Sequence, residues 1–404
     1  MNDLRANRWQ LPDGVNELLP DDAWRVETLR RQVMDRAHHW GYELIMPPLI
    51  EYLDSLLTGT GEMLDLQTFK IIDQHNGRSL GVRADMTPQV ARMDAHALRS
   101  ELPSRFFYTG SVLRARTDGA GGSRTPLQFG AELFGHQGPE SDAEIIQLML
   151  DSMALAGLSH DDMLLDLGHV GVYRALIENF DIPIEIEKPL FESLIRGSQP
   201  EVAQLLNSVA DKPGMSLFNE HMHALLSLSG RCDYVLASAR ERLHKAGSAV
   251  HDALDNLESI ITKVQAAHPA LQIHIDLAEL RGYSYHTGIL FTLYDNAGRV
   301  LAKGGRYDAI GEAFGTARPA TGFSSDLINL ALSQQPMVNE MRVASSGIWV
   351  DDPGGPGVHE HMVKLRAQGK RVVCALAGSK LTAQTCHCNQ QLVLQDKQWR
   401  VVDL

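Results

Sequence analysis

The sequence predicts an α+β fold, in which antiparallel strands are flanked by helices. The first observation is a strand–turn–strand pattern: the runs 289–294 and 300–308 are rich in β-branched and aromatic residues and flank a polar Asp-Asn-Ala-Gly turn. The second is a mostly helical stretch at about 172–267, which we interpret as an insertion. The third is the tail at 341–404, which alternates strand and helix patterns. We therefore expect a core domain over 1–332 that carries the helical insertion, followed by a small C-terminal α/β domain.

The composition is that of a globular chain able to bury a sizeable core. The 404 residues, with 44% hydrophobic and 22% charged side chains, favour two or three domains. The formal net charge of -13 argues against tRNA or DNA as the main ligand, because nucleic-acid binders usually present a basic face. The N-terminus carries no apolar signal region and no run reaches the length of a membrane span, so we expect a cytoplasmic protein with no membrane partner.

The cysteines do not indicate a disulfide framework, because the chain has only 4 of them. Cys374, Cys386 and Cys388 lie near the C-terminus, with His387 between the last two. These residues could supply zinc ligands, but a structural zinc site needs four ligands at spaced positions. We therefore expect no metal and no other cofactor, and Cys386-His387-Cys388 is left without a role.

The N-terminal part is expected to form a helix and then a strand. The helix starts after Pro20, where Asp21 and Asp22 suit a helix N-terminus, and it ends at Gly41. A strand is expected at 42–46, stopped by two prolines. Apolar residues at three- and four-residue steps mark the buried face of the helix, namely Val26, Leu29, Val33, Ala37 and Trp40.

The next elements are a hairpin, a helix and two longer strands. Short strands are expected at 68–73 and 79–83, joined by a His-Asn-Gly hairpin turn, and a helix at 88–99 has proline near its first turn. Strands at 105–115 and 127–134 enclose a glycine-rich loop. That loop lacks the Gly-Lys-Ser/Thr ending of a phosphate-binding P-loop.

A further helix is expected to open with a capping box made by Ser141 and Glu144 and to run to Ala156. Its core-facing stripe consists of Ile145, Leu148, Met149, Ser152 and Met153, in which the methionines are expected to pack rather than to bind a cofactor.

The C-terminal third is expected to continue, after the hairpin, with a turn and a helix at 317–332. The tail then contains a strand at 347–350, a helix at 359–368, a strand at 371–377 and a last hairpin around Asp396-Lys397.

The hairpin at 277–308 carries an unusual number of glycines next to polar and aromatic side chains. Glycines in a strand allow a ligand to approach the backbone closely, but they can equally serve β-bulges in an ordinary hairpin. The glycines are Gly282, Gly288, Gly304 and Gly305, and the polar and aromatic residues are Arg281, Tyr285, His286, Arg306, Tyr307 and Asp308.

These pieces together resemble the catalytic core of class II aminoacyl-tRNA synthetases, and specifically histidyl-tRNA synthetase, over about residues 10–332. The helix–strand–proline pattern at 23–48 is similar to motif 1, the dimer-forming element of that family, and it implies a homodimer through this N-terminal element. Residues 108–135 resemble motif 2, and residues 322–330 stand where motif 3 is expected. Arg281-Gly-Tyr-Ser-Tyr-His286 and Gly304-Gly-Arg-Tyr-Asp308 resemble the two signatures peculiar to the histidine enzyme.

The residues that hold ATP in the synthetase are replaced in this chain. The Glu-Arg pair of motif 3, whose arginine holds an ATP phosphate, corresponds to Ile328 and Asn329, and neither of these carries a charge. In motif 2, the arginine at the α-phosphate is kept as Arg114, whereas the glutamate that contacts adenine is Arg116 and the phenylalanine that stacks on it is Pro126. We therefore predict a dismantled adenylation site and no catalytic residues.

The amino-acid pocket of the synthetase is largely kept. Gln128 stands at an amino-group or ring contact, and Glu132 stands where an acid accepts the imidazole N–H in a charge-assisted hydrogen bond. The alternative is a relict site whose polar groups only satisfy one another, although buried polar groups are costly to leave unfilled. Of the residues that the resemblance implies, Arg281 would face the substrate carboxylate, and Tyr285 and His286 stand where a pair of tyrosines lines the pocket of the synthetase. The histidine-binding residues implied by the resemblance are Asp85, Thr87, Arg114, Gln128, Glu132, Arg281, Tyr285 and His286.

The tail from Met341 to Leu404 is shorter than the anticodon-binding domain of the synthetase and has too small a basic excess for an RNA face. A histidine pocket without an ATP site or an anticodon domain closely resembles the regulatory subunits of short-form ATP phosphoribosyltransferase. That family implies a catalytic partner subunit, no tRNA, and feedback inhibition of histidine biosynthesis with histidine as the effector.

Three other functions stay open from the residues alone. The first is an active histidyl-tRNA synthetase, and another is a histidine-responsive binding module that is linked to a kinase or mimics tRNA, which the acidic charge disfavours. A third is a phosphoribosyltransferase catalytic subunit, suggested by Ile348-Trp-Val-Asp351-Asp352-Pro-Gly-Gly. That stretch is loosely like a loop that binds phosphoribosyl pyrophosphate, but it lacks the Thr-Gly phosphate cradle, and a plain turn explains it as well.

Overall fold

The structure is a computed structural model that describes residues 10–59, 62–98, 100–117, 122–209, 215–280, 282, 285–333 and 347–404. The chain divides into two compact units, Met1–Gln334 and Gln335–Leu404, each of which has its own core. No helix in the described part of the chain combines the length and apolar character needed to cross a membrane.

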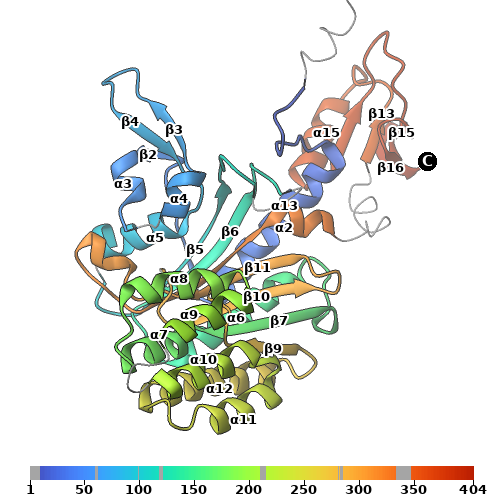
Figure 1. The fold of residues 1–404 in the computed structure, drawn as a ribbon. Coiled ribbons are helices and arrows are strands. Elements are labelled where there is room, and N and C mark those ends of the chain that lie inside the picture. Colours follow the sequence, from blue (N-terminus) through green and yellow to red (C-terminus); the bar gives the residue numbers. More distant parts are fainter. Residues whose placement is uncertain are drawn as a thin grey trace, which may run out of the picture. The chain divides into compact units, whose positions relative to one another are not determined.

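The first unit is built on a 9-stranded sheet in the order β1-β5-β6-β12-β11-β10-β7-β9-β8 (Figure 1). The pairs β1–β5 and β7–β9 are parallel, and the other neighbours are antiparallel. The predicted α+β class is therefore confirmed. The strands are β1 (Glu43–Leu44), β5 (Ser104–Ser111), β6 (Leu127–Phe134), β7 (Met163–His169), β8 (Ser229–Arg231), β9 (Gln272–Asp276), β10 (Ile289–Asp295), β11 (Val300–Arg306) and β12 (Ala320–Asp326).

One face of this sheet is apolar and is covered by helices. Alternate residues of the central strands, such as Ala131, Leu167 and Phe323, belong to one continuous core. The helices α2 (Pro20–His39), α6 (Pro139–Ala154), α12 (Ser248–Ala267) and α13 (Leu327–Ser333) contribute to that core. All five predicted stripe residues of α6 are buried, and so are those of α2 except Trp40, which is half-buried.

The predicted helical stretch folds as a group of helices beside β7 and β9, drawn in green to olive in Figure 1. Buried leucines and valines join these helices to the main core, because each helix presents one apolar face. The helices are α7 (Val170–Asn179), α8 (Ile184–Ile195), α9 (Gln199–Val209), α10 (Met215–Ser227), α11 (Cys232–Arg242) and α12, with the short strand β8 between α10 and α11.

A second sheet of 3 strands, in the order β2-β4-β3, follows β1 in the chain. The predicted hairpin is confirmed, and Gly77 at its turn has φ 75°, a conformation that glycine adopts without strain. The strands are β2 (Ile50–Tyr52), β3 (Phe69–Ile72) and β4 (Ser79–Val82), accompanied by α3 (Leu53–Leu57), α4 (Glu62–Gln67), α5 (Thr87–Arg92) and a π-helical turn at Met93–Leu98.

The second unit is a 4-stranded sheet in the order β14-β13-β15-β16 with one helix. The predicted strand, helix, strand and hairpin are confirmed, and Asp396 and Lys397 at the hairpin turn both have positive φ values. The elements are β13 (Gly347–Val350), α15 (Val358–Ala367), β14 (Arg371–Cys374), β15 (Cys388–Gln395) and β16 (Gln398–Asp403).

Two element predictions are wrong. The turn predicted from 317 onward is instead the strand β12, because this polar-looking run lies between β6 and β11 in the middle of the sheet. The capping box at Ser141 and Glu144 is also absent, since α6 already begins at Pro139, whose fixed φ suits a first helical turn. Ser141 Oγ instead donates to the Gly138 carbonyl at 2.8 Å, and Glu144 pairs with Arg105.

The hairpin glycines do not mark bulges. The register shift between β10 and β11 lies at Leu293/Tyr294, away from Gly304 and Gly305. A Cβ at Gly304 would lie 2.2 Å from the Gly322 carbonyl oxygen, and one at Gly305 would lie 2.6 Å from that of Ile289. These glycines therefore serve the close approach of neighbouring strands.

Candidate functional site

The strand register brings two of the predicted pocket residues, Gln128 and Glu132, to the face of the sheet opposite the main apolar core. Glu132 on β6 pairs with Gly322 on β12, and Gln128 pairs with Asp326. Residues directly opposite each other on antiparallel strands point to the same face, so these four positions share one surface. A Cβ at Gly322 would lie 1.5 Å from Glu132 Oε2, and only a glycine leaves room for this carboxylate.

Glu132 is the centre of this site and is only 1% exposed. Its Oε1 accepts hydrogen bonds from Thr87 Oγ1 and from the Tyr108 hydroxyl, both at 2.9 Å, and its Oε2 accepts one from the Tyr307 hydroxyl. Burial raises the pKa of Glu132 to about 8, although the three hydroxyl donors act in the opposite direction. The site therefore favours a protonated carboxyl until a ligand supplies a stronger donor or a positive charge.

The loop before α5 forms one wall of the site. Asp85 Oδ1 accepts from the Thr87 backbone N–H at 2.8 Å, and Gln128 Oε1 accepts from the Met86 N–H at 3.0 Å. Arg83, which is 7% exposed, fixes the start of this loop by donating to the Pro47 carbonyl at 2.6 Å. Thr87, Gln128 and Glu132 are thus held together by bonds between residues far apart in the sequence.

Gln128 Nε2 and the Tyr285 hydroxyl are among the buried polar atoms that have no hydrogen-bond partner within the described part of the chain. The Tyr285 ring stacks on Tyr307, with ring centroids 5.2 Å apart and an interplanar angle of 30°. Buried polar atoms without partners are costly, so a polar ligand that reaches both would stabilise the site.

His286 has a hydrogen bond to the backbone of Arg306 that the sequence did not indicate. Its Nδ1 lies 3.2 Å from the Arg306 carbonyl oxygen, and Arg174 Nη2 donates to the His286 carbonyl at 3.1 Å. Burial lowers the pKa of His286 to about 4, so the ring is neutral near pH 7. Nδ1 then donates to Arg306, and Nε2 is left to accept a hydrogen bond.

Two arginines are among the predicted histidine-binding residues, and the structure describes only one of them. Arg114 is half-buried, and its Nε donates to the Ala84 carbonyl at 3.4 Å, next to Asp85. Arg281 lies outside the described residues.

The motif 3 positions that hold an ATP phosphate in the synthetase carry no basic side chain here, whereas Arg114 stands at its α-phosphate position. Asn329 is exposed, Ile328 is half-buried and Pro126 is buried. Asp326 Oδ1 instead accepts from the backbone N–H groups of Ile328 at 3.0 Å and Leu127 at 3.2 Å. A carboxylate at this point disfavours a phosphate group by like-charge repulsion.

Sequence reasoning missed two residues of the site. Tyr108 and Tyr307 both donate to Glu132, yet the sequence does not assign either to the ligand pocket, although Tyr307 belongs to the hairpin cluster. The signal for Tyr307 is its place in Gly304-Gly-Arg-Tyr-Asp308; Tyr108 is one aromatic among several in its strand and carries no such signal. Arg306, in the same cluster, donates to Asp142 of α6 and to Asp308.

The C-terminal motifs do not form a second site in the described residues. Asp351 Oδ1 accepts from the Trp349 indole at 2.5 Å, and its other oxygen bonds to Gln391, so this carboxylate fixes the turn after β13. The described chain contains no group of His, Cys, Asp and Glu side chains that could hold a metal ion. Cys386 and Cys388 are free, and Arg371 donates to the Cys386 carbonyl at 2.8 Å.

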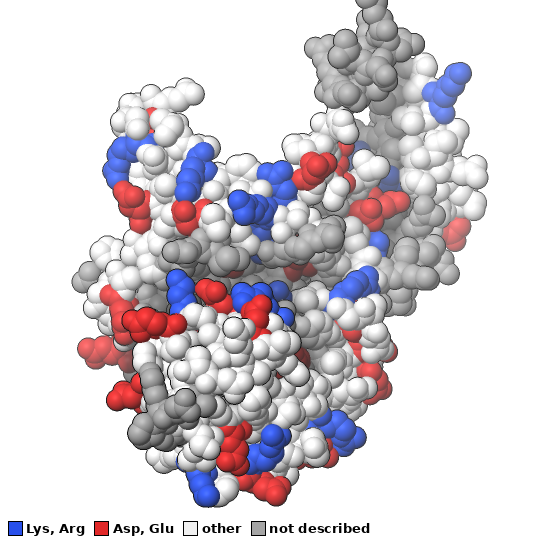
Figure 2. Space-filling view, viewed as in Figure 1, with Lys and Arg blue, Asp and Glu red and all other residues white. Residues whose placement is uncertain are grey.

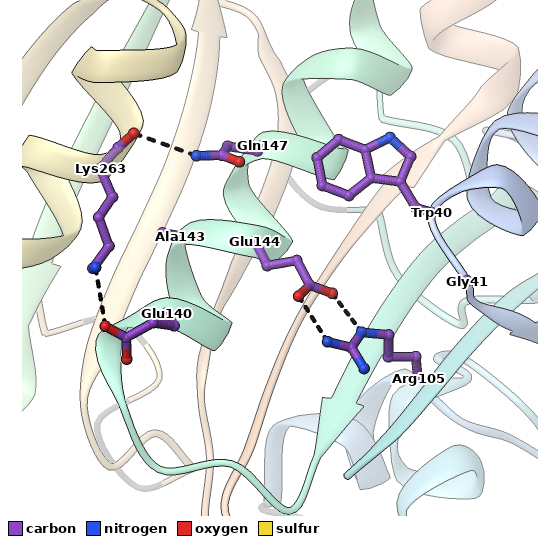
Figure 3. Close-up of a pocket in the computed structure, with 8 residues that line it drawn as sticks. All are labelled: Trp40, Gly41, Arg105, Glu140, Ala143, Glu144, Gln147 and Lys263. Atoms are coloured by element: carbon purple, nitrogen blue, oxygen red, sulfur yellow. Dashed lines mark hydrogen bonds and ion pairs between the residues drawn. The ribbon is translucent and has the colours of Figure 1, made fainter.

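A hollow of about 490 Å³ lies away from Glu132, on the outer side of α6 (Figure 3). It is lined by Trp40, Arg105, Glu140, Glu144, Gln147 and Lys263. Its charges are already paired, since Glu144 holds Arg105 at 2.7 Å and Glu140 holds Lys263 at 2.9 Å. The hollow therefore lacks the unsatisfied groups that distinguish the Glu132 site.

The face of the molecule in Figure 2 shows basic and acidic side chains interspersed, without an extended patch of one sign among the described residues. A nucleic-acid surface needs clustered Lys and Arg, and this face does not provide them.

Comparison with known proteins gives concordant matches. The family model described as histidyl-tRNA synthetase matches residues 14–330, and the model described as the ATP phosphoribosyltransferase subunit HisZ C-terminal domain matches residues 345–402. ATP phosphoribosyltransferase regulatory subunits from Thioalkalivibrio sulfidiphilus and Pseudomonas fluorescens are 49% and 46% identical, and each match covers 99% of both chains.

Solved structures agree with this assignment. The crystal structure of an ATP phosphoribosyltransferase regulatory subunit/histidyl-tRNA synthetase from Bacillus halodurans matches with TM-score 0.79 and 26% identity, over 95% of this chain and 97% of that one. Histidyl-tRNA synthetase from Nostoc shares the fold, with TM-score 0.74, 16% identity and coverage of 98% and 97%. The predicted class II synthetase-like fold is confirmed, and the chain belongs to the family of ATP phosphoribosyltransferase regulatory subunits.

Proposed function

We propose that histidine binds at the Glu132 site and that its binding feeds back on an ATP phosphoribosyltransferase catalytic subunit, the enzyme of the first step of histidine biosynthesis. The observation that carries this proposal is the buried Glu132 carboxyl, ringed by three hydroxyls and flanked by two polar atoms without partners. Such a site suits a small ligand with several N–H donors and an aromatic ring.

Free histidine matches these groups one by one. Its imidazole N–H can donate to Glu132, and its ring can lie against the stacked Tyr285 and Tyr307. Its ammonium group can reach Asp85 and Thr87, while Gln128 Nε2 is a free donor in the same space. The ligand carboxylate would then face Arg114, with Arg281 as the second cation.

The chain itself is proposed to be catalytically inert. The exposed Asn329, the apolar Ile328 and the Asp326 carboxylate leave no cation to hold a triphosphate at the motif 3 position. Its effect on phosphoribosyl transfer would therefore depend on the partner subunit. Feedback requires only that histidine binds two states of the assembly with different affinities.

Two contacts with other chains are proposed. A homodimer through α2 and β1 is supported by exposed apolar side chains in this element, including Trp24 at 62%, Leu44 at 42% and Met46 at 74% exposure. The hetero-oligomer with the catalytic subunit follows from the family. We further propose a core domain at 1–332 with its insertion at about 172–267, a C-terminal domain at 341–404, a cytoplasmic location and no tRNA partner.

The function is tested by co-purifying the chain with a short-form ATP phosphoribosyltransferase catalytic subunit. Turnover of ATP and phosphoribosyl pyrophosphate is expected only in the complex and is expected to fall when histidine is added. Turnover by this chain alone would favour a catalytic subunit instead. A complex whose turnover ignores histidine would refute the feedback role.

Replacing Glu132 by Ala is expected to weaken histidine binding by roughly 1.5–3 kcal/mol, because a hydrogen bond to a charged group is lost. Titration calorimetry at pH 7 measures the change. Glu258→Ala is a matched control, because Glu258 is an exposed residue that pairs with Arg240 outside the site. Unchanged affinity in Glu132→Ala would remove this residue from the binding site.

Replacing Asn329 by Arg is expected not to restore adenylation. Arg116 and Pro126 would still occupy the adenine contacts of motif 2, and Asp326 would still place a negative charge beside Gln128. Histidine-dependent exchange of labelled pyrophosphate into ATP measures the reaction. Exchange by the wild-type chain would instead identify an active synthetase-like enzyme.

A further inference from the structure

Arg306 lies at the end of β11, one residue before the tyrosine that donates to Glu132, and its guanidinium is turned away from the site. Its Nε and Nη2 pair with the two oxygens of Asp142 at 3.1 and 3.0 Å, and Nη2 also donates to Ser141 Oγ at 2.8 Å. Nη1 donates to the His136 carbonyl at 3.1 Å. All of these acceptors belong to the first turn of α6 or to the segment just before it.

The backbone of the same residue holds the other wall of the Glu132 site. The Arg306 carbonyl accepts from the Thr287 N–H at 2.8 Å and lies 3.2 Å from His286 Nδ1. The next residue, Tyr307, donates to Glu132. Arg306 therefore connects the first turn of α6 to His286, Thr287 and Tyr307, which line one wall of the Glu132 site.

The pair of Arg306 and Asp142 is stiff because it is buried. The two side chains are 7% and 0% exposed, so neither can exchange its partner for water. A buried pair resists separation strongly, because a lost partner leaves an unpaired charge in a medium of low dielectric constant. A shift of the chain at Tyr307, the residue after β11, would consequently be passed on to Asp142.

The first turns of α6 have a second, outward face. Glu140 and Glu144 on that face bind Lys263 of α12 and Arg105 of β5, beside the hollow in Figure 3. The same short segment thus touches the ligand site through Asp142 and the molecular surface through Glu140 and Glu144.

We propose that Arg306 is a positioning residue that couples the Glu132 site to the first two turns of α6, so that occupancy of the site changes the stability of this surface segment. The identity of the ligand as histidine rests on the proposed function. The coupling itself runs through Glu132, Tyr307, Arg306 and Asp142, and it exists without ligand.

The ligand-free protein gives the first test, by hydrogen exchange of the backbone amides of residues 140–146. Tyr307→Phe and Tyr108→Phe each remove one hydroxyl from Glu132, but only Tyr307 is next to Arg306. Exchange in α6 is expected to be about fivefold faster in Tyr307→Phe, the effect of one lost hydrogen bond on local opening. It is expected to be unchanged in Tyr108→Phe. Equal behaviour of the two variants overturns the coupling, whatever the ligand is.

Histidine gives the second test. Saturating histidine is expected to slow exchange in α6 of the wild type, whereas Arg306→Lys is expected to lose this protection and to bind histidine about tenfold more weakly. Arg318→Lys is the matched control, because Arg318 forms another largely buried pair, with Asp94 at 3.0 Å, that does not touch Glu132. Protection that persists in Arg306→Lys overturns the inference. A wild type that does not bind histidine refutes the proposed function, and the ligand-free comparison of Tyr307→Phe with Tyr108→Phe then decides whether the coupling exists.

Discussion

Replacing Glu132 by Gln is expected to make the protein increasingly more stable than the wild type as the pH rises from about 5 to 8. Burial raises the pKa of Glu132 from 4.5 to about 8, so the folded protein keeps a proton that the unfolded chain releases above about pH 4.5. The free energy of unfolding of the wild type therefore falls with rising pH through this interval, relative to a neutral side chain of the same shape. The difference is expected to be on the order of 4 kcal/mol at pH 8.

Guanidinium unfolding at several pH values measures this difference. Glu27→Gln is a suitable control, because hydrogen bonds from Arg30 and Arg31 lower the pKa of Glu27 to about 2. The contribution of Glu27 to the free energy of unfolding is thus constant above about pH 5. The free energy of unfolding of Glu27→Gln should therefore change with pH in the same way as that of the wild type. Parallel curves for Glu132→Gln as well would show that Glu132 is ionised in the folded protein throughout.

The raised pKa of Glu132 also predicts that ligand binding changes the number of protons bound to the protein. A ligand that brings a charged or strongly polar N–H group to Glu132 favours the carboxylate, so binding near pH 7 should release a proton. The apparent enthalpy of histidine binding is then expected to change with the ionisation enthalpy of the buffer, and this dependence should vanish in Glu132→Gln.

Replacing Gly322 by Ala is expected to destabilise the protein by about 3 kcal/mol or more and to abolish histidine binding. The new Cβ would lie 1.5 Å from Glu132 Oε2 and 2.7 Å from the Ala131 carbonyl oxygen. The backbone oxygen belongs to the centre of the sheet and cannot retreat, and the carboxyl is held by three hydroxyls. Thermal unfolding and calorimetry measure the two effects.

A double-mutant cycle identifies the cause of this loss. If the collision with the carboxyl dominates, Gly322→Ala should cost much less in a Glu132→Ala background, because the space is then open. Ser324→Ala, two residues further along β12, is a control that adds no atom near Glu132. Additive effects of the two substitutions would assign the loss to backbone crowding alone.

Local sequence patterns were sufficient for most elements. The three- and four-residue apolar steps of α2 and α6, the His-Asn-Gly turn and the hairpin at Asp396-Lys397 each depend on residues close together in the chain. The strand β12 was missed for the opposite reason: its small polar residues resemble a turn, and only the burial between β6 and β11 makes them a strand.

The sequence indicated which residue types form the pocket, but it did not indicate which partner each side chain contacts. Glu132, Gln128 and Thr87 were expected in one site and lie together there. His286, a predicted ligand contact, also has Nδ1 at the Arg306 carbonyl, and Tyr108 and Tyr307 hold the central carboxyl. Side-chain direction depends on packing against distant strands, which no local pattern contains.

The sequence by itself determined the α+β class, the family and the presence of the uncharged Asn329 at the motif 3 position, because these follow from residue identities along the chain. Only the tertiary structure decided that Glu132 is buried under three hydroxyls, that Gly322 must be a glycine and that Arg306 serves α6. The physical reason is that burial and charge pairing are properties of neighbours in space, and the sheet register, rather than the order of residues, selects those neighbours.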